Sequence, residues 1–148
     1  MSGNIKTLDK LNKYSSIALD SNIFIYFFEN HPSFFKKTKS IFMKLAENSL
    51  AATTSIITLT EILSFPLSLA AVEKTVENFY ITPNLKIIEV DQAVALEAAR
   101  IRREYKFRLP DSIQLSTALK SGVKAFITND ERLKSFKELQ VLTLKDLV

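Results

Sequence analysis

Short apolar runs alternate with longer amphipathic stretches along this chain, a pattern typical of strands and helices that build a parallel sheet. The runs predict strands over residues 17–19, 50–53, 85–90, 125–127 and 141–144. The first run lacks polar alternation and is expected to be buried on both faces. The amphipathic stretches predict helices over 23–28, 33–47, 57–65, 72–79, 92–105 and 111–119. We therefore expect an α/β fold, a three-layer α/β/α sandwich around a central parallel sheet of about four to five strands.

Several residues predict where the helices begin and end. Ser33 and Asp91 are expected N-caps, because their side-chain oxygens can accept hydrogen bonds from the first amides of a helix. Pro110 is expected to open a helix and Pro66 to end or kink one, because proline lacks the amide donor. Gly122 is a natural C-cap, since glycine adopts the left-handed conformation at little cost.

Three carboxylates stand alone in apolar stretches. Asp20 is the sole charge between positions 13 and 29, Glu61 between 47 and 73, and Asp111 between 108 and 120. At 100° per residue, Glu61 shares a helical stripe with Ile57 and Phe65, so it interrupts an apolar face. An ionised carboxylate is rarely buried without a partner, because its desolvation costs several kcal/mol. These positions therefore predict a function for the acids.

The predicted topology brings these acids to one edge of the sheet. Asp20 and Asp130 directly follow strands, Asp111 opens a helix, and Glu61 lies one turn into a helix. Ligands of open parallel sheets bind at the carboxyl ends of the strands. Like charges about 4 Å apart repel by about 4 kcal/mol at an effective dielectric near 20, so some acids must be protonated or a cation must enter. Oxygen ligands select Mg²⁺ or Mn²⁺, which can activate water and polarise a phosphodiester.

Each acid also has a purely structural interpretation. Asp20 could close a strand-to-helix turn, and Asp111 and Asp130 could each be a helix N-cap. Glu61 could face solvent or pair with an arginine such as Arg108. Taken singly, the aspartates are better explained as caps, and it is their joint pattern that favours a site.

Composition narrows the chemistry. The chain has 148 residues, no cysteine, a single histidine (His31) and only two glycines, Gly3 and Gly122. These counts exclude disulfides, thiolate metal sites, multi-histidine cages and glycine-rich phosphate loops. The N-terminus is too polar for a signal peptide, and no apolar run approaches the roughly 18 residues that span a bilayer, so we expect a cytoplasmic protein.

The net charge of +4 is mild, but basic residues gather in two places. Either group could neutralise backbone phosphates or form a solvated helix face. The candidates for RNA binding are Arg100, Arg102, Arg103, Lys106 and Arg108; the other group is Lys36, Lys37, Lys39 and Lys44.

The chain resembles the PIN-domain ribonucleases, and most closely the VapC-like toxins of toxin–antitoxin pairs, from about Ile17 to Leu144. The likeness rests on four segments in order: Leu19-Asp20-Ser21-Asn22, Thr58-Leu59-Thr60-Glu61-Ile62-Leu63, Leu109-Pro110-Asp111-Ser112-Ile113-Gln114 with Ala118, and Phe126-Ile127-Thr128-Asn129-Asp130. It divides the chain into an N-terminal extension, 1–14, and a single PIN-like nuclease domain, 15–148. Arg132 and its neighbours depart from the pattern, because many members have a further acid and a phenylalanine there.

The resemblance implies a metal-dependent endoribonuclease in which Asp20, Glu61, Asp111 and Asp130 ligate Mg²⁺ or Mn²⁺ and drive cleavage of RNA. Asn22 and Thr128 would support these ligands. The resemblance also implies a homodimer and a cognate antitoxin whose C-terminal segment covers the active-site groove. Apolar side chains that could serve such contacts are Phe24, Phe27, Phe28, Phe34, Phe35 and the run 62–67, although core packing explains each singly.

Three other functions compete with this interpretation. A catalytically silent PIN-like module that binds RNA or protein would keep the fold without cleavage. A haloacid-dehalogenase-like phosphatase requires a second acid where this chain has Asn22. A receiver domain requires a phosphorylatable aspartate after the third strand, and Glu89 and Asp91 match that poorly.

Overall fold

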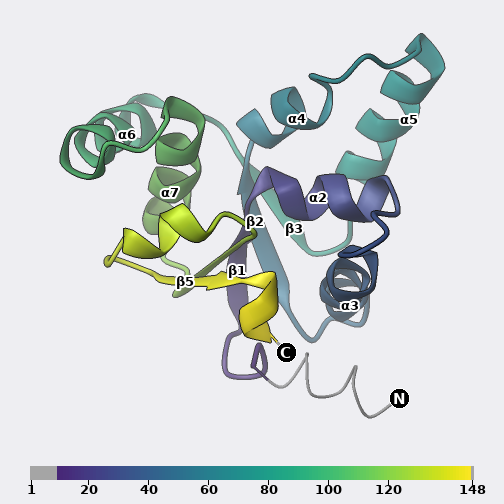
Figure 1. Ribbon diagram of the computed structural model, residues 1–148, viewed down its shortest axis with the longest axis horizontal. Helices are drawn as coiled ribbons and strands as arrows, with labels where there is room; N and C mark the ends of the chain where they lie inside the picture. The colour runs from purple at the N-terminus through teal and green to yellow at the C-terminus, as the bar shows by residue number, and fades with distance from the viewer. Residues whose placement is uncertain (1–9, 148) are drawn as a thin grey trace.

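The computed structural model describes residues 10–147, and its centre is one five-stranded parallel sheet (Figure 1). The strands lie in the order β3-β2-β1-β4-β5. Their bounds are β1 (Ser16–Leu19), β2 (Ala51–Ser55), β3 (Leu85–Ile88), β4 (Ala125–Thr128) and β5 (Gln140–Thr143). The predicted α/β/α class, with its parallel sheet, is confirmed.

Within residues 10–147, six helices cover the sheet, with α6 and α7 on one side and α2 to α5 on the other (Figure 1). Their bounds are α2 (Ser21–Phe28), α3 (Phe35–Ala46), α4 (Ile57–Ile62), α5 (Leu69–Tyr80), α6 (Gln92–Tyr105) and α7 (Leu109–Ser121). Two short 3-10 helices, η1 (Glu131–Ser135) and η2 (Leu144–Leu147), flank β5. Asp91 caps α6 and Gly122 ends α7 with φ 76°, both as predicted.

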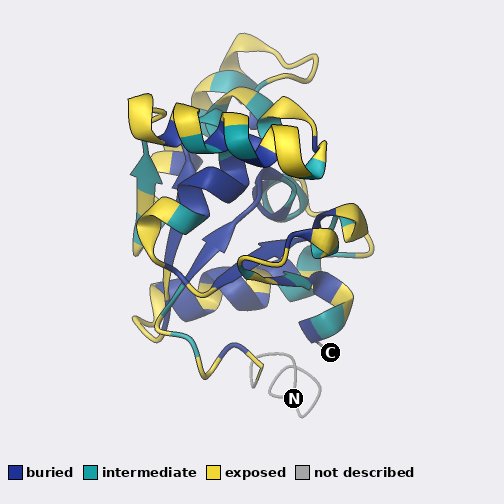
Figure 2. Cartoon of the chain, turned by 90° about the vertical axis from the view of Figure 1, so that its left-hand side faces the viewer, coloured by how far each residue is buried: buried dark blue, intermediate teal, exposed yellow. Residues whose placement is uncertain are grey.

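The central strands are buried on both faces, as the lack of polar alternation in the first run predicts. Ile17 and Leu19 of β1 pack in a core with α2 and α3, whereas Ala18 packs in a second core with α6 and α7. Phe126 of β4 joins the second core. Figure 2 shows this buried interior between exposed outer helix faces. The sheet is therefore held rigidly from both sides, which fixes the loops at its carboxyl edge.

Two local predictions are wrong. Ser33 is not the N-cap of α3, because His31 Nδ1 already accepts the Ser33 and Phe34 amides and the helix begins at Phe35. The predicted helix 57–65 ends at Ile62, and Phe65 lies in the following loop, 45% exposed. Glu61 therefore does not share an apolar stripe with Phe65.

Residues 1–9 and 148 lie outside the described part of the chain, so the structure describes only residues 10–14 of the predicted N-terminal extension, 1–14. Leu11 is buried in the core, and Lys44 Nζ donates to Asn12 Oδ1 over 2.7 Å. The boundary at residue 15 stays a prediction. Among the residues described, no helix is long and apolar enough to cross a membrane.

Candidate active site

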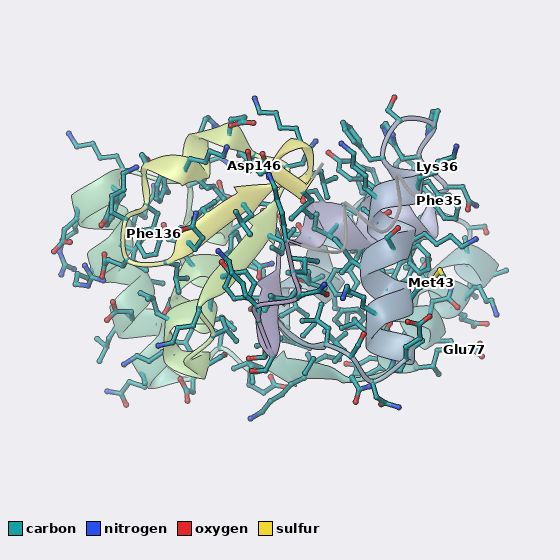
Figure 3. The ribbon with its side chains drawn as sticks, turned by 90° about the horizontal axis from the view of Figure 1, so that it is seen from below. Phe35, Lys36, Met43, Glu77, Phe136 and Asp146 are labelled. Atoms are coloured by element: carbon teal, nitrogen blue, oxygen red, sulfur yellow. The ribbon has the colours of Figure 1, made fainter. Side chains whose placement is uncertain are left out.

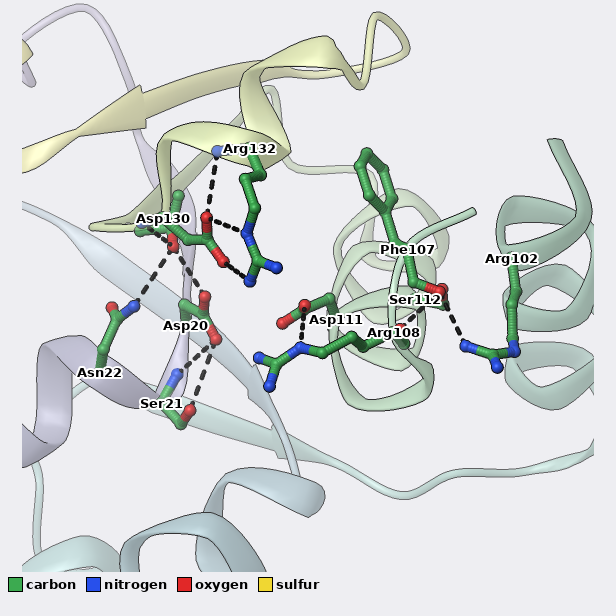
Figure 4. Close-up of polar contacts among 11 residues, drawn as sticks. Asp20, Ser21, Asn22, Arg102, Phe107, Arg108, Asp111, Ser112, Asp130 and Arg132 are labelled. Atoms are coloured by element: carbon green, nitrogen blue, oxygen red, sulfur yellow. Dashed lines mark hydrogen bonds and ion pairs between the residues drawn. The ribbon is translucent and has the colours of Figure 1, made fainter. Parts of the chain in front are cut away.

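Sheet topology brings three of the predicted acids to one place. Asp20 follows β1 and Asp130 follows β4, and these two strands are neighbours. Asp111 lies in the first turn of α7. Figure 4 shows the side chains of all three directed toward a common space at the carboxyl edge of the sheet. This is the edge at which open parallel sheets bind ligands.

Asp20 is the most enclosed of the acids, at 4% exposure. Its Oδ1 accepts the Ser21 amide over 2.8 Å, and its Oδ2 accepts the Thr128 hydroxyl over 2.7 Å. Burial, with a smaller contribution from the nearby Asp111 and Glu61 carboxylates, raises the pKa of Asp20 to about 7, although the hydrogen bonds from Thr128 and Ser21 act in the opposite direction. Asp20 is thus a buried acid that lies within electrostatic reach of two others.

Thr128 contacts this carboxylate directly, and Asn22 contacts Thr128. Thr128 Oγ1 donates to Asp20 and accepts the Asp130 amide at 3.1 Å and Asn22 Nδ2 at 3.4 Å. Among the described residues, Asn22 Oδ1 is the buried side-chain polar atom that has no hydrogen-bond partner. One hydroxyl therefore orients both aspartates that follow strands.

Arginines of the chain itself neutralise the other two aspartates. Arg108 Nε donates to Asp111 Oδ2 over 3.1 Å, and Arg132 Nε donates to Asp130 Oδ1 over 2.9 Å (Figure 4). Asp111 is buried at 6% exposure, whereas Asp130 is half-buried. Hydrogen bonding from Arg132 holds the pKa of Asp130 below its usual value. Arg132, which departs from the family pattern, was not among the predicted site residues.

The observed contacts show which of the acids act as helix caps or pair with Arg108. Asp20 caps α2, and Asp130 caps η1, so both are caps as well as members of the cluster. Asp111 is not an N-cap, because Arg108 occupies that position at the start of α7. Arg108 pairs with Asp111 and not, as one alternative had it, with Glu61. Glu61 is half-buried in α4.

The donor chemistry fits a hard cation, because the side chains gathered here offer carboxylate oxygens without sulfur or imidazole. Within residues 10–147, however, no three or more acidic, histidine or cysteine side chains are grouped so that they could hold a metal ion. Asp111 and Asp130 are each paired with an arginine, whose guanidinium already supplies positive charge to the carboxylate. A cation would therefore have to replace these contacts.

The predicted basic cluster is largely used within the fold. Arg100 forms ion pairs with Glu97, Glu104 and Glu138. Arg102 donates to the Phe107 carbonyl and so stabilises the turn between α6 and α7. Arg108 pairs with Asp111, as described above, and Arg103 and Lys106 are exposed.

A model of the PIN domain matches residues 17–139, and the protein therefore belongs to the PIN domain family. This confirms the family that the four segments indicate. No curated protein matches the sequence.

The fold is similar to that of chains from three bacterial complexes. A chain of a toxin–antitoxin complex from Klebsiella pneumoniae has 24% identity and a TM-score of 0.62, covering 86% of this chain and 97% of its own. A chain of VapBC2 from Rickettsia felis, bound to a promoter DNA fragment, has 20% identity and a TM-score of 0.69, covering 86% and 98%. A chain of FitAcB from Neisseria gonorrhoeae has 19% identity and a TM-score of 0.63, covering 87% and 98%. At these identities the likeness establishes a shared fold.

Proposed function

We propose that this PIN domain is a metal-dependent endoribonuclease that hydrolyses RNA phosphodiester bonds. The observation that carries the proposal is Asp20, a buried carboxylate at the carboxyl edge of the sheet whose pKa is raised to about 7 by burial and by two neighbouring acids. A charge in that position destabilises a fold unless a cation or a proton compensates it. Perturbed acids of this kind gather at functional sites.

Asp20, Glu61, Asp111 and Asp130 are the residues proposed to hold Mg²⁺ or Mn²⁺, and they are also the proposed catalytic residues. When bound, such an ion supplies Lewis acidity toward a phosphoryl oxygen and lowers the pKa of water. Thr128 and Asn22 hold Asp20 and Asp130 in fixed orientations through the hydrogen bonds described above.

Positively charged side chains around the acids are proposed to hold the RNA backbone. The side chains of Arg108 and Arg132 are 63% and 66% exposed, so their guanidinium groups remain accessible to phosphate. Arg103 and Lys106 extend the basic surface over α6 and the turn that follows it. Guanidinium groups suit this role because they bind phosphate through two parallel hydrogen bonds.

The similar chain from Klebsiella pneumoniae belongs to a toxin–antitoxin complex, and on that basis we propose that this protein is the toxin of a toxin–antitoxin pair. An apolar groove of about 510 Å³ lies between α2, α3 and α5. Phe35 and Met43 lie along the α3 side of this groove (Figure 3). Such a surface suits an apolar segment of a partner. A homodimer, with exposed Leu96 and Leu109 as contact candidates, belongs to the same proposal.

One observation favours the alternative of a silent RNA- or protein-binding module. Asp111 and Asp130 are already paired with arginines. A site that only binds phosphate could keep these ion pairs, because it needs no metal ion on the carboxylates. In that case the guanidinium groups bind RNA while the carboxylates orient them.

Cleavage of a mixed RNA by the purified protein, with and without Mn²⁺, tests the proposal. The variant Asp20→Asn should lose cleavage and keep RNA binding, because it removes a proposed ligand and no positive charge. Glu77→Gln, on the exposed face of α5, is the matched control and should cut like the wild type. RNA binding without metal-dependent cutting by wild-type protein freed of any copurified partner would favour the silent module.

A further inference from the structure

A line of buried hydrogen bonds runs beneath the candidate site. Gln114 Nε2 donates to Thr58 Oγ1 over 2.8 Å, and Thr58 Oγ1 lies 2.7 Å from Thr54 Oγ1. Thr54 Oγ1 in turn donates to the Leu19 carbonyl over 2.8 Å. Because a carbonyl only accepts, the Thr54 hydrogen is committed to Leu19, and Thr58 must donate to Thr54. We call Gln114, Thr58 and Thr54 the polar chain; its bonds all point from α7 toward β1.

All three side chains of the polar chain are at most 2% exposed, so water cannot replace a lost partner. Buried hydrogen bonds in series strengthen one another, and an orphaned member carries the full penalty of desolvation. The chain therefore resists changes in the distances between the elements that it joins.

Two members lie one helical turn from proposed ligands. Gln114 is three residues after Asp111 in α7, and Thr58 is three residues before Glu61 in α4. Residues three apart share a helix face. The bond between Gln114 and Thr58 thus connects the two helices close to the carboxylates that they carry.

The other end of the chain clamps the peptide of Asp20. The register of β1 on β2 pairs Ala18 with Thr53, which brings the next pair, Leu19 and Thr54, side by side. The Leu19 carbonyl accepts from Thr54, while the Asp20 amide of the same peptide donates to the Ile127 carbonyl over 3.0 Å. That peptide is held from both neighbouring strands.

We propose that the polar chain is a positioning device that sets the spacing of Asp20, Glu61 and Asp111. Its members contact none of the reacting groups and act through the three backbone segments that carry the acids. The inference rests on the proposed nuclease function and adds residues that the four family segments did not single out for a role. Removal of groups that do not touch the metal but orient its ligands typically lowers metal affinity or activity 10–100-fold.

The test uses isosteric variants of the full chain. Thr58→Val removes the hydroxyl and keeps the shape, and Thr58→Ser restores the hydroxyl. The double variant Thr58→Val/Gln114→Leu removes both partners, so that no buried donor is left unpaired. Thr117→Val is the matched control, because Thr117 is equally buried on α7 but bonds only within that helix, to the Ile113 carbonyl.

Three experiments are made: calorimetric titration gives the Mn²⁺ dissociation constant, kinetics on one RNA give kcat and KM, and hydrogen exchange of the Asp20 amide is followed without metal. Thr58→Val should weaken Mn²⁺ binding and lower kcat by about 10-fold or more, and should speed the exchange. Thr58→Ser should recover most of each loss, and Thr117→Val should match the wild type. The double variant should regain melting temperature but not Mn²⁺ affinity.

Equal Mn²⁺ affinity and kcat in Thr58→Val and Thr117→Val would overturn the inference. So would a double variant that recovers affinity together with stability, since the role would then be structural alone. A wild type that neither binds Mn²⁺ nor cuts RNA overturns the proposed function instead. In that event the exchange rate of the Asp20 amide still tests whether the polar chain fixes the backbone at Asp20. An unchanged rate in Thr58→Val would refute the positioning role.

Discussion

The Thr128 hydroxyl donates to Asp20 over 2.7 Å, although the two residues lie 108 positions apart. The parallel register explains this contact, because Leu19 pairs with Ile127 and the next residues of the two strands are therefore neighbours. The same hydroxyl accepts the Asp130 amide. Sheet pairing in the core thus places a hydrogen-bond donor under the most buried acid of the site.

Burial of Asp20 predicts a pH dependence of stability. Its pKa is 3.8 in an exposed chain and about 7 in the fold, so the folded state binds the proton more tightly. Its contribution is therefore fully present below about pH 4 and is lost as the pH rises through about 7, by on the order of 4 kcal/mol. Urea unfolding in EDTA should show this decline in the wild type.

Asp20→Asn is the control for that prediction, because the amide does not titrate. The difference in unfolding free energy between variant and wild type should grow from pH 4 to pH 7 in favour of the variant. A difference that stays constant over this range would mean that Asp20 is charged in the fold at acidic pH, with Thr128 and Ser21 compensating its burial.

Divalent cations should raise the melting temperature of the wild type. A ligand that binds only the folded state at 100 times its dissociation constant adds about 2.7 kcal/mol, which corresponds to several degrees. Thermal scans with Mg²⁺ or Mn²⁺ check this. Asp111→Asn should lose most of the shift, while Glu77→Gln should keep it. An equal shift in both variants would place the cation elsewhere.

Much of this architecture could be predicted from sequence, because local patterns report local causes. The apolar run 17–19 predicts a buried strand, and Gly122 ends α7 as its lack of a side chain predicts. Asp20 and Asp130 could be placed at one sheet edge, because both follow strands. The end of α4 at Ile62 was harder to place, since Pro66 indicates a nearby stop but Phe65 continues the apolar period past Ile62.

The partners of the acids were harder to foresee than their location. Arg132 bonds Asp130 two residues away, yet it stands in a charged stretch that is typical of any exposed turn. The polar chain is less visible still, because Thr58 and Gln114 lie 56 residues apart and meet only through packing of α4 against α7. Gln114 is one of several polar residues that α7 buries, and nothing in the sequence around it identifies Thr58 as its partner.

Arg132→Gln should separate the two roles of the guanidinium groups. Removal of a competing positive charge from Asp130 should tighten Mn²⁺ binding severalfold, whereas loss of a phosphate contact should weaken RNA binding. Stability should change by less than about 1 kcal/mol, because the Arg132 side chain is 66% exposed and its ion pair is solvated. Calorimetric titration and RNA binding assays check the two effects. Weaker Mn²⁺ binding would show that Arg132 orders Asp130 and does not compete with the ion.

The basic surface beside the site makes a prediction about salt. Arg103→Gln and Lys106→Gln remove exposed charges for which no internal contact is described above, whereas Arg100 is ion-paired and Arg102 donates to the Phe107 carbonyl. If each contacts a phosphate, the slope of log affinity against log salt should fall by about 0.7 per variant for single-stranded RNA. Lys120→Gln, exposed at the opposite end of α7 from Asp111, changes the net charge equally and should leave the slope unchanged. A common decrease in all three variants would mean that net charge alone attracts RNA, and the cluster would then be a solvated helix face.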